Sequence, residues 1–133
     1  MSRYLLDTNI LSDLIRNPKG KVATHIARVG ESRVCTSIVV AAELRYGCAK
    51  NGSQRLLAAV EALLTEMKVL PVEAPADTEY GKIRAELERA GTLIGSNDLL
   101  IAAHALAIDA TIVTANVDEF ARVKGLKVKN WLL

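Results

Sequence analysis

Residues 3–18 read RYLLDTNILSDLIRNP, and this stretch joins a short apolar run, a polar turn and a second apolar pattern. Tyr4–Leu6 suits a buried strand, and the polar residues 7–9 suit a turn. Apolar residues at 10, 11, 14 and 15 then recur at helical spacing until Pro18 ends the pattern. The stretch therefore predicts a strand, a tight turn and a helix in that order.

The same kind of unit recurs along the chain. Residues 34–36 suit a strand, and Ser37 suits the cap of a helix over 38–49. A helix is expected over 53–67, then a short strand over 68–73 that Pro71 confines to a sheet edge. Further helices are expected over 76–90, with Gly91 as the stop, over about 97–107 and over 117–123. The remaining strands are expected over 111–115 and 126–131.

Strands that alternate with helices predict an α/β fold, a three-layer α/β/α domain with a central, mostly parallel sheet. The chain has 133 residues with no internal repeat or linker, so residues 1–133 are expected to form a single domain. Cys35 and Cys48 have no metal or redox spacing, and no secretory segment or membrane span is visible, which favours the cytoplasm. A net charge of +2 neither supports nor excludes an RNA partner.

Residues 94–107, IGSNDLLIAAHALA, combine an almost wholly apolar run with one acid near its head, Asp98. One interpretation is structural: an acid in the first turn of a helix is stabilised by the helix dipole, with Ser96 or Asn97 as the N-cap. The other is functional, because further acids are expected near strand ends. His104 follows Asp98 by six residues, about 240° around the helix, so a buried, hydrogen-bonded histidine is expected rather than a general base.

Asp7 directly follows the first predicted strand, at the end where ligand sites form in parallel sheets. It also suits a turn or an N-cap. Glu43 lies in SIVVAAELRYG, where its neighbours four residues away are Val39 and Gly47, so no basic residue there pairs with it. A solvated glutamate and a functional one are both compatible with this segment. Clustered carboxylates with no cysteine or histidine cluster favour a hard cation, Mg²⁺ or Mn²⁺, and with it phosphodiester hydrolysis.

The segments LLDTNILSDLI, SIVVAAELRYG, IRAELERAG, IGSNDLLIAAHALA, TIVTANVDEF and GLKVKNW together resemble the PIN domain, and in particular the VapC-type toxin ribonucleases of bacterial toxin–antitoxin modules. The resemblance runs nearly end to end. It implies that Asp7, Glu43 and Asp98 are the catalytic acids and hold Mg²⁺, for which Mn²⁺ can substitute. It further implies a parallel sheet flanked by helices, and a homodimer.

Several neighbouring residues acquire auxiliary roles through this resemblance. Asn9 and Ser37 or Thr114 would orient the carboxylates, as short polar side chains can. Many PIN domains carry a further acid in a T-x-D motif, where this chain has Thr114-Ala115-Asn116, so an amide replaces the carboxylate. Glu119 is either an acid that compensates for this change or a solvated residue of a short helix.

The function implied by the resemblance is a metal-dependent endoribonuclease, the toxin of a VapBC-type module. Its expected substrate is RNA, transfer RNA ahead of ribosomal RNA, and its expected inhibitor is a cognate VapB-type antitoxin that fills the acidic site. A non-catalytic PIN-like module that binds RNA or protein is the alternative, and Asn116 keeps it open. A phospho-acceptor receiver domain is disfavoured, because it needs an acidic pair after its first strand and here Thr8 follows Asp7.

Overall fold

The computed structural model describes residues 2–133, and a five-stranded parallel sheet lies at its centre. The strands are β1 (Arg3–Leu6), β2 (Val34–Ser37), β3 (Lys68–Leu70), β4 (Ala110–Val113) and β5 (Val128–Lys129). They stand in the order β3-β2-β1-β4-β5, and each neighbouring pair runs parallel. The predicted α/β fold is confirmed, and the sheet is wholly parallel.

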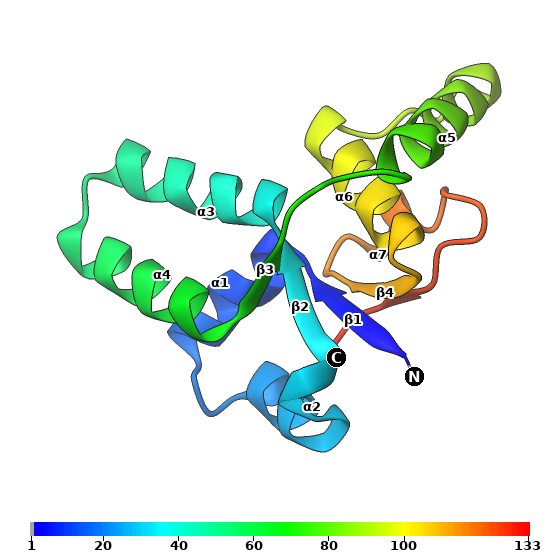
Figure 1. Cartoon of the computed structure of the whole chain (residues 1–133). Coiled ribbons are helices and arrows are strands. Elements are labelled where there is room, and N and C mark those ends of the chain that lie inside the picture. The colour runs from blue at the N-terminus through cyan, green and yellow to red at the C-terminus, as the bar shows by residue number, and fades with distance from the viewer. Residues whose placement is uncertain (1) are drawn as a thin grey trace.

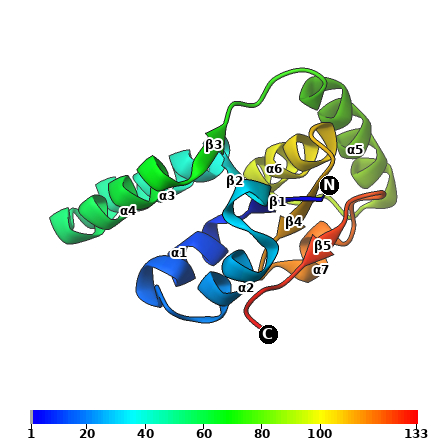
Figure 2. The same ribbon diagram turned by 60° about the horizontal axis from the view of Figure 1, so that its bottom comes forward.

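Helices cover both faces of this sheet, as Figures 1 and 2 show. On one side lie α1 (Thr8–Arg16), α2 (Lys21–Val29), α3 (Ile38–Asn51) and α4 (Gln54–Glu66). On the other lie α5 (Ala76–Ala90), α6 (Ser96–Ala107) and the short α7 (Val117–Phe120). This division follows from right-handed crossovers, because the chain moves outward from β1 to β3 and then returns across the sheet to β4. Paired α3 and α4 extend away from the sheet as an arm (Figure 1).

The helix boundaries follow the capping chemistry of the sequence. Asp7, Ser37 and Ser53 are the N-caps of α1, α3 and α4, and each side chain accepts a hydrogen bond from a backbone N–H of its helix. Helix α5 ends at Gly91, whose φ of 69° lies in the left-handed region that favours glycine. These caps place Asp7 and Ser37 at the junctions where strands become helices.

The core lies between the sheet and the helices on either face. Among its largest fully buried side chains are Leu5 and Leu6 of β1, Ile112 of β4 and Ile101 of α6. Helix α6 is buried along most of its length, as its apolar sequence predicts, and Leu100 is its one large apolar side chain classed as exposed. Burial of β1 and α6 fixes the two elements that carry Asp7 and Asp98.

Several element boundaries and one helix cap differ from the sequence-based expectations. The sequence patterns predict no element over residues 19–33, yet this segment contains α2, whose Val22, Ile26 and Val29 have helical spacing, and a 3₁₀ turn over Glu31–Arg33. The expected side-chain cap of α6 by Ser96 or Asn97 is wrong, because Gly95 is the N-cap and no side chain caps the helix. Helix α7 and strand β5 are both shorter than expected. Strand β3 lies at the sheet edge as predicted, but it ends at Leu70, before Pro71, and not at residue 73. Strand β4 ends at Val113 and not at residue 115.

Within residues 2–133, no helix combines the length and the apolar character that crossing a membrane requires.

Candidate functional site

The carboxyl ends of the three central strands bring together residues that are far apart in the chain. Asp7 follows β1, Ser37 ends β2 and Thr114 follows β4, and β1 lies between the other two. The backbone N–H of Asp7 donates to the Val113 carbonyl at 2.9 Å, which ties this end of β1 to β4. Asp7 therefore lies at the carboxyl edge of the sheet, as the sequence predicts.

Asp7 is nearly inaccessible, with 3% of its surface exposed, and both of its carboxylate oxygens are hydrogen-bonded. Oδ1 accepts from the Thr8 backbone N–H at 2.8 Å, and Oδ2 accepts from the Thr114 hydroxyl at 2.8 Å. Burial raises the pKa of Asp7, the bonds from Thr114 and Thr8 oppose that rise, and the charges of Glu43 and Glu119 add to it. The carboxylate is thus held in one orientation beside other negative charges.

Glu43 reaches this edge from the second turn of α3. Its Oε1 accepts from the hydroxyl of Thr8, and its Oε2 accepts from the side-chain amide of Asn97 at 3.3 Å. The first contact crosses to α1 and the second to α6, so a residue on the arm is tied to both neighbouring helices. These contacts favour the functional interpretation of Glu43 over a solvated one.

Asp98 lies in the first turn of α6, where it is close to other acids as well as to the helix terminus. Its pKa is raised to about 7, first by burial, then by the charges of Asp7, Glu119 and Glu43, and by a hydrogen bond with Glu119. The same acids therefore perturb Asp98 and Asp7. The structure brings together the three predicted acids and Glu119, which the sequence left open.

The auxiliary residues divide into those that support this acidic cluster and one that faces elsewhere. Besides holding Asp7, the Thr114 hydroxyl accepts from the Asn116 backbone N–H at 3.0 Å. Asn9 Oδ1 accepts from the Ala115 backbone N–H at 3.1 Å, so α1 also supports the loop after β4. Glu119 Oε1 accepts from the Gly95 backbone N–H at 3.2 Å, next to the start of α6.

Ser37 is the auxiliary residue whose contacts lead away from the carboxylates. Its hydroxyl oxygen accepts from the Val39 backbone N–H at 3.1 Å and lies 2.8 Å from Nδ1 of His104. His104 is 1% exposed, and burial lowers its pKa. Within residues 2–133, its Nε2 has no hydrogen-bond partner. The prediction of a buried, hydrogen-bonded histidine is confirmed through Nδ1.

Thr8 and Asn97 are the two polar contacts of Glu43 that sequence reasoning missed. A signal existed for each, since Thr8 follows Asp7 in LDTN and Asn97 precedes Asp98 in SNDLL. Short polar residues beside candidate acids are natural partners for a third carboxylate.

The acidic cluster has no internal cation to neutralise it. Over the described residues 2–133, the only Lys or Arg ion pairs are Arg45 with Glu61 and Arg84 with Glu88, and neither involves the cluster. In the same range, no three His, Cys, Asp or Glu side chains stand in an arrangement that by itself suits a metal ion. Mg²⁺ does not require such a closed arrangement, because it keeps several waters and fills its other positions with carboxylate and phosphate oxygens. The donor set fits such a hydrated ion, with oxygen ligands only.

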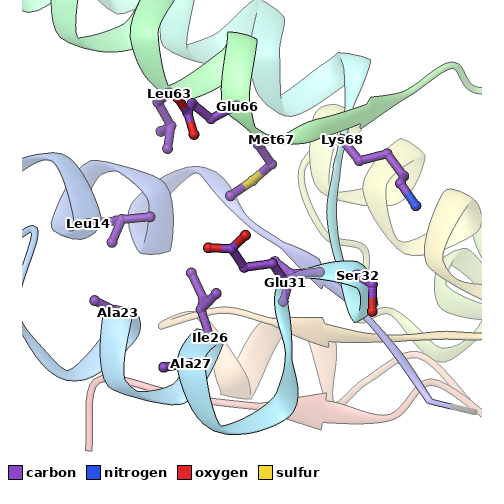
Figure 3. A pocket seen from close by; sticks show the side chains of 11 residues that line it. Leu14, Ala23, Ile26, Ala27, Glu31, Ser32, Leu63, Glu66, Met67 and Lys68 are labelled. Carbon is purple, nitrogen blue, oxygen red and sulfur yellow. The ribbon is translucent and has the colours of Figure 1, made fainter.

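A separate groove of about 540 Å³ lies on the α1–α2–α4 side of the sheet. Leu14, Ile26, Leu63 and Met67 surround it, and Glu31 points into it (Figure 3). None of the clustered acids lines this groove. Cavity size therefore does not locate the site that the carboxylates define.

The fold and this cluster define a class of protein, an α/β domain with an acidic site at the carboxyl edge of a parallel sheet. The sequence pattern of the PIN domain matches residues 4–126, so the chain belongs to the PIN domain family.

Relatives within this family share the whole length of the chain. The chain is 39% identical to the tRNA(fMet)-specific endonuclease VapC of Shigella flexneri, over 98% of this chain and 99% of that protein. It is 35% identical to the ribonuclease VapC2 of Rickettsia felis, over 96% and 97%. Among solved structures, the DNA-bound VapBC complex of Salmonella typhimurium contains a chain 36% identical to this one, with a TM-score of 0.89 over 98% and 99%.

Proposed function

We propose that this protein is an endoribonuclease, the toxin of a VapBC-type toxin–antitoxin module, and that it hydrolyses RNA with Mg²⁺ held at Asp7, Glu43 and Asp98. The observation that carries the proposal is the cluster of Asp7, Glu43, Asp98 and Glu119, in which the neighbouring charges raise the pKa of Asp7 and Asp98 and with which no Lys or Arg of residues 2–133 forms an ion pair. The family membership of the chain and the names of its relatives support the choice of reaction.

The proposed roles follow from the contacts of each residue. Asp7 is the fixed ligand, because its two hydrogen bonds leave it a single orientation. Glu43 is adjustable, because Thr8 and Asn97 hold it by side-chain bonds that can yield to an ion. Asp98 lies close enough to Asp7 for the two charges to repel each other, so both can bind one cation. Glu119 accepts a hydrogen bond from the Gly95 backbone N–H and so stabilises the segment before α6. A bound Mg²⁺ supplies charge stabilisation for the phosphate and lowers the pKa of a bound water.

Transfer RNA is the proposed substrate, ahead of ribosomal RNA. The Shigella relative is named for cleavage of the initiator transfer RNA, and it matches this chain nearly end to end. Folded RNAs offer loops whose unstacked bases a protein can read.

A small antitoxin of the VapB type is the proposed inhibitor, and the toxin itself is proposed to be a homodimer. The solved structures from Rickettsia felis and Salmonella typhimurium to which this chain is similar are complexes named VapBC. The acidic cluster offers charge complementarity to a basic antitoxin segment.

Cleavage of total transfer RNA by the purified protein tests the nuclease proposal. We expect cutting with Mg²⁺ or Mn²⁺ and none with EDTA. Asp7→Asn and Glu43→Gln should each reduce the rate by about 100-fold or more, since loss of even an indirect support of a metal site costs about 10–100-fold. Asp77→Asn is the matched control, an exposed first-turn acid of α5 that should keep full activity.

Undiminished cutting by Asp7→Asn would remove that residue from the proposed machinery. Binding of transfer RNA without any cutting would instead favour the non-catalytic PIN-like module, for which Asn116 in place of an acid is the relevant feature.

Co-expression with a VapB-type protein, sought among the small proteins encoded beside it, tests the partner proposal. We expect a stable complex that cuts little RNA, and recovered cutting after the partner is removed. A saturated complex as active as the free protein would contradict inhibition by occlusion of the acidic site.

A further inference from the structure

A second pocket, of about 300 Å³, opens beside Glu43 between α1, α3 and α4. It shares Thr8 and Glu43 with the acidic cluster, so it is continuous with the candidate active site. Its volume matches the lower end of the range for small-molecule sites. It is distinct from the groove of Figure 3, with which it shares no lining residue.

The pocket changes character along α1. Thr8, Ser12, Ile15 and Arg16 line it from one face of this helix, at spacings of four, seven and eight residues. Thr8 and Ser12 supply hydroxyls at the end near the carboxylates, and Arg16 supplies a guanidinium from the last turn, where its backbone lies about 12 Å along the helix axis from that of Thr8. The wall therefore runs from polar to apolar to cationic, starting at the candidate active site.

The opposite wall is apolar and partly open. Leu56 and Val60 of α4 face the pocket together with Leu44 of α3. Arg16 is exposed, and among residues 2–133 it makes no ion pair with an acid, so its charge is available to a ligand.

Gly47 keeps the α3 wall open. It lies in the interior of α3 and lines the pocket, and a Cβ placed on it would meet no other atom within 4 Å. Glycine is unfavourable in a helix interior compared with alanine. The missing side chain thus weakens the helix while it leaves space beside Glu43.

We propose that this pocket binds one unstacked nucleotide of the RNA substrate, next to the phosphate that is cut. The base lies between Ile15 and Leu56, and Arg16 binds the phosphate on the far side of that nucleotide. This inference rests on the proposed function, because it places the neighbouring phosphate at the cation that Asp7 and Asp98 are proposed to hold.

A nucleotide fits this pocket better than a purely apolar or purely anionic ligand. Unstacked RNA bases pack their flat faces against side chains and satisfy their edges by hydrogen bonds, which apolar walls and the Ser12 hydroxyl provide. Arginine binds phosphate by paired hydrogen bonds. A nucleotide within an RNA chain presents its base to one side and a phosphate at each end of its sugar, which matches an apolar wall flanked by the candidate active site and by Arg16.

Filling the pocket at Gly47 tests the inference by kinetics. In Gly47→Leu we expect the KM for transfer RNA to rise about ten-fold or more with kcat little changed, the scale at which pocket contacts discriminate substrates. Gly81→Leu is the matched control, because Gly81 is also a helix-interior glycine whose added Cβ would meet nothing within 4 Å. It lies on α5, outside the pocket, and should leave both constants unchanged.

Nucleotide binding to the metal-free protein gives a readout that does not depend on cleavage. Adenosine, guanosine, cytidine and uridine 5′-monophosphates would be titrated while the backbone amide signals of Ser12 and Gly47 are followed by NMR. We expect at least one nucleotide to shift both signals, and Gly47→Leu to abolish the response. Arg16→Gln should weaken it about ten-fold, the loss expected for one charge-assisted contact. Inorganic phosphate alone should affect Arg16 without shifting Gly47.

The two experiments separate this inference from the proposed function. Nucleotide binding at Gly47 in a protein that cuts no RNA would overturn the nuclease and retain the pocket. Normal cutting and an unchanged KM in a folded Gly47→Leu would overturn the pocket and retain the nuclease. Absence of any nucleotide-induced shift at Gly47 or Ser12 would also overturn it.

Discussion

Asp98 is the residue at which two explanations of the same sequence diverge. A first-turn acid stabilises a helix through its dipole, and Asp98 occupies that position in α6. Yet the neighbouring charges of Asp7, Glu119 and Glu43 disfavour its ionised form, as does its burial. Together with a hydrogen bond to Glu119 they raise its pKa to about 7. The metal-free protein therefore carries a carboxyl whose ionisation destabilises the native state.

This reasoning predicts the pH dependence of stability in EDTA. The pKa of Asp98 is 3.8 in its ordinary state and about 7 in the folded protein, so between these values the native state holds a proton that the unfolded chain has released. The contribution of Asp98 to stability therefore declines as pH rises through this window. We expect Asp98→Asn to stabilise the protein, by a few kcal/mol at most given its partial exposure, and by more at about pH 8 than at about pH 5.

Urea unfolding of the parent and of Asp98→Asn at both pH values measures this difference. Asp77→Asn serves as the control, because its carboxylate lies exposed in the first turn of α5 and should show no such gain. A loss of stability in Asp98→Asn at both pH values would return Asp98 to the role of a helix-terminus acid.

At the scale of residues, the identity of the acids is more predictable than their contacts. Asp7, Glu43 and Asp98 each stand out locally, after a strand or on an apolar helix. The bond from Thr8 to Glu43 joins residues 35 apart, and that from Asn97 to Glu43 joins residues 54 apart. Such pairings depend on how helices pack, which no local pattern encodes.

Helix α3 is the element that links the acidic cluster to the core. Ser37 caps it at one end of β2, and the same hydroxyl contacts His104 inside α6. A hydroxyl has one proton and two lone pairs, so Ser37 can accept from Val39 and still form a hydrogen bond with Nδ1 of either imidazole tautomer. The cap of the helix that carries Glu43 is thus also the partner of a buried imidazole.

Because Ser37 both caps α3 and contacts His104, we expect its removal to lower the free energy of unfolding more than the removal of Ser53, which only caps α4. Ser53→Ala removes the cap of α4 and should cost about 1 kcal/mol of unfolding free energy. Ser37→Ala should cost that amount plus about 1–3 kcal/mol, because it leaves Nδ1 of buried His104 without a partner. Urea unfolding at neutral pH measures both. Equal costs would mean that the contact between Ser37 and His104 contributes nothing to stability.

Among the elements, long patterned helices and buried strands were predictable and short or irregular ones were not. Helix α5 matches its prediction at both ends, because its amphipathic pattern is long and Gly91 stops it. Helix α2 has nine residues and only three apolar positions in register, so its signal is weak. Strand β5 pairs with β4 over two residues only, and its length depends on that neighbour rather than on its own sequence.

The sheet order unites these elements into one site across the whole molecule. Strand β1 lies between β2 and β4, so Asp7 comes next to Thr114, a separation of 107 residues in the chain. Alternation of strands and helices predicts a parallel sheet and hence a shared functional edge. It does not predict which strands are neighbours, and that order decides which acids share charge.

A cation that binds this shared edge must stabilise the whole fold. Binding to the native state alone adds about 2.7 kcal/mol when the free ion is 100-fold above its Kd. We therefore expect the melting temperature of the parent to rise by several degrees as Mg²⁺ or Mn²⁺ is added at neutral pH.

Asp98→Asn should start from a higher melting temperature in EDTA and gain much less from either ion, because it has less repulsion to relieve and one ligand fewer. Asp77→Asn should follow the parent at every metal concentration. A higher melting temperature in EDTA combined with a smaller gain from the ion is specific to a ligand, since a general loss of stability would lower the melting temperature with and without metal. If Asp98→Asn and the parent gained equally from the ion, Asp98 would not be a ligand, and the cation would bind through Asp7 and Glu43 alone or at another place.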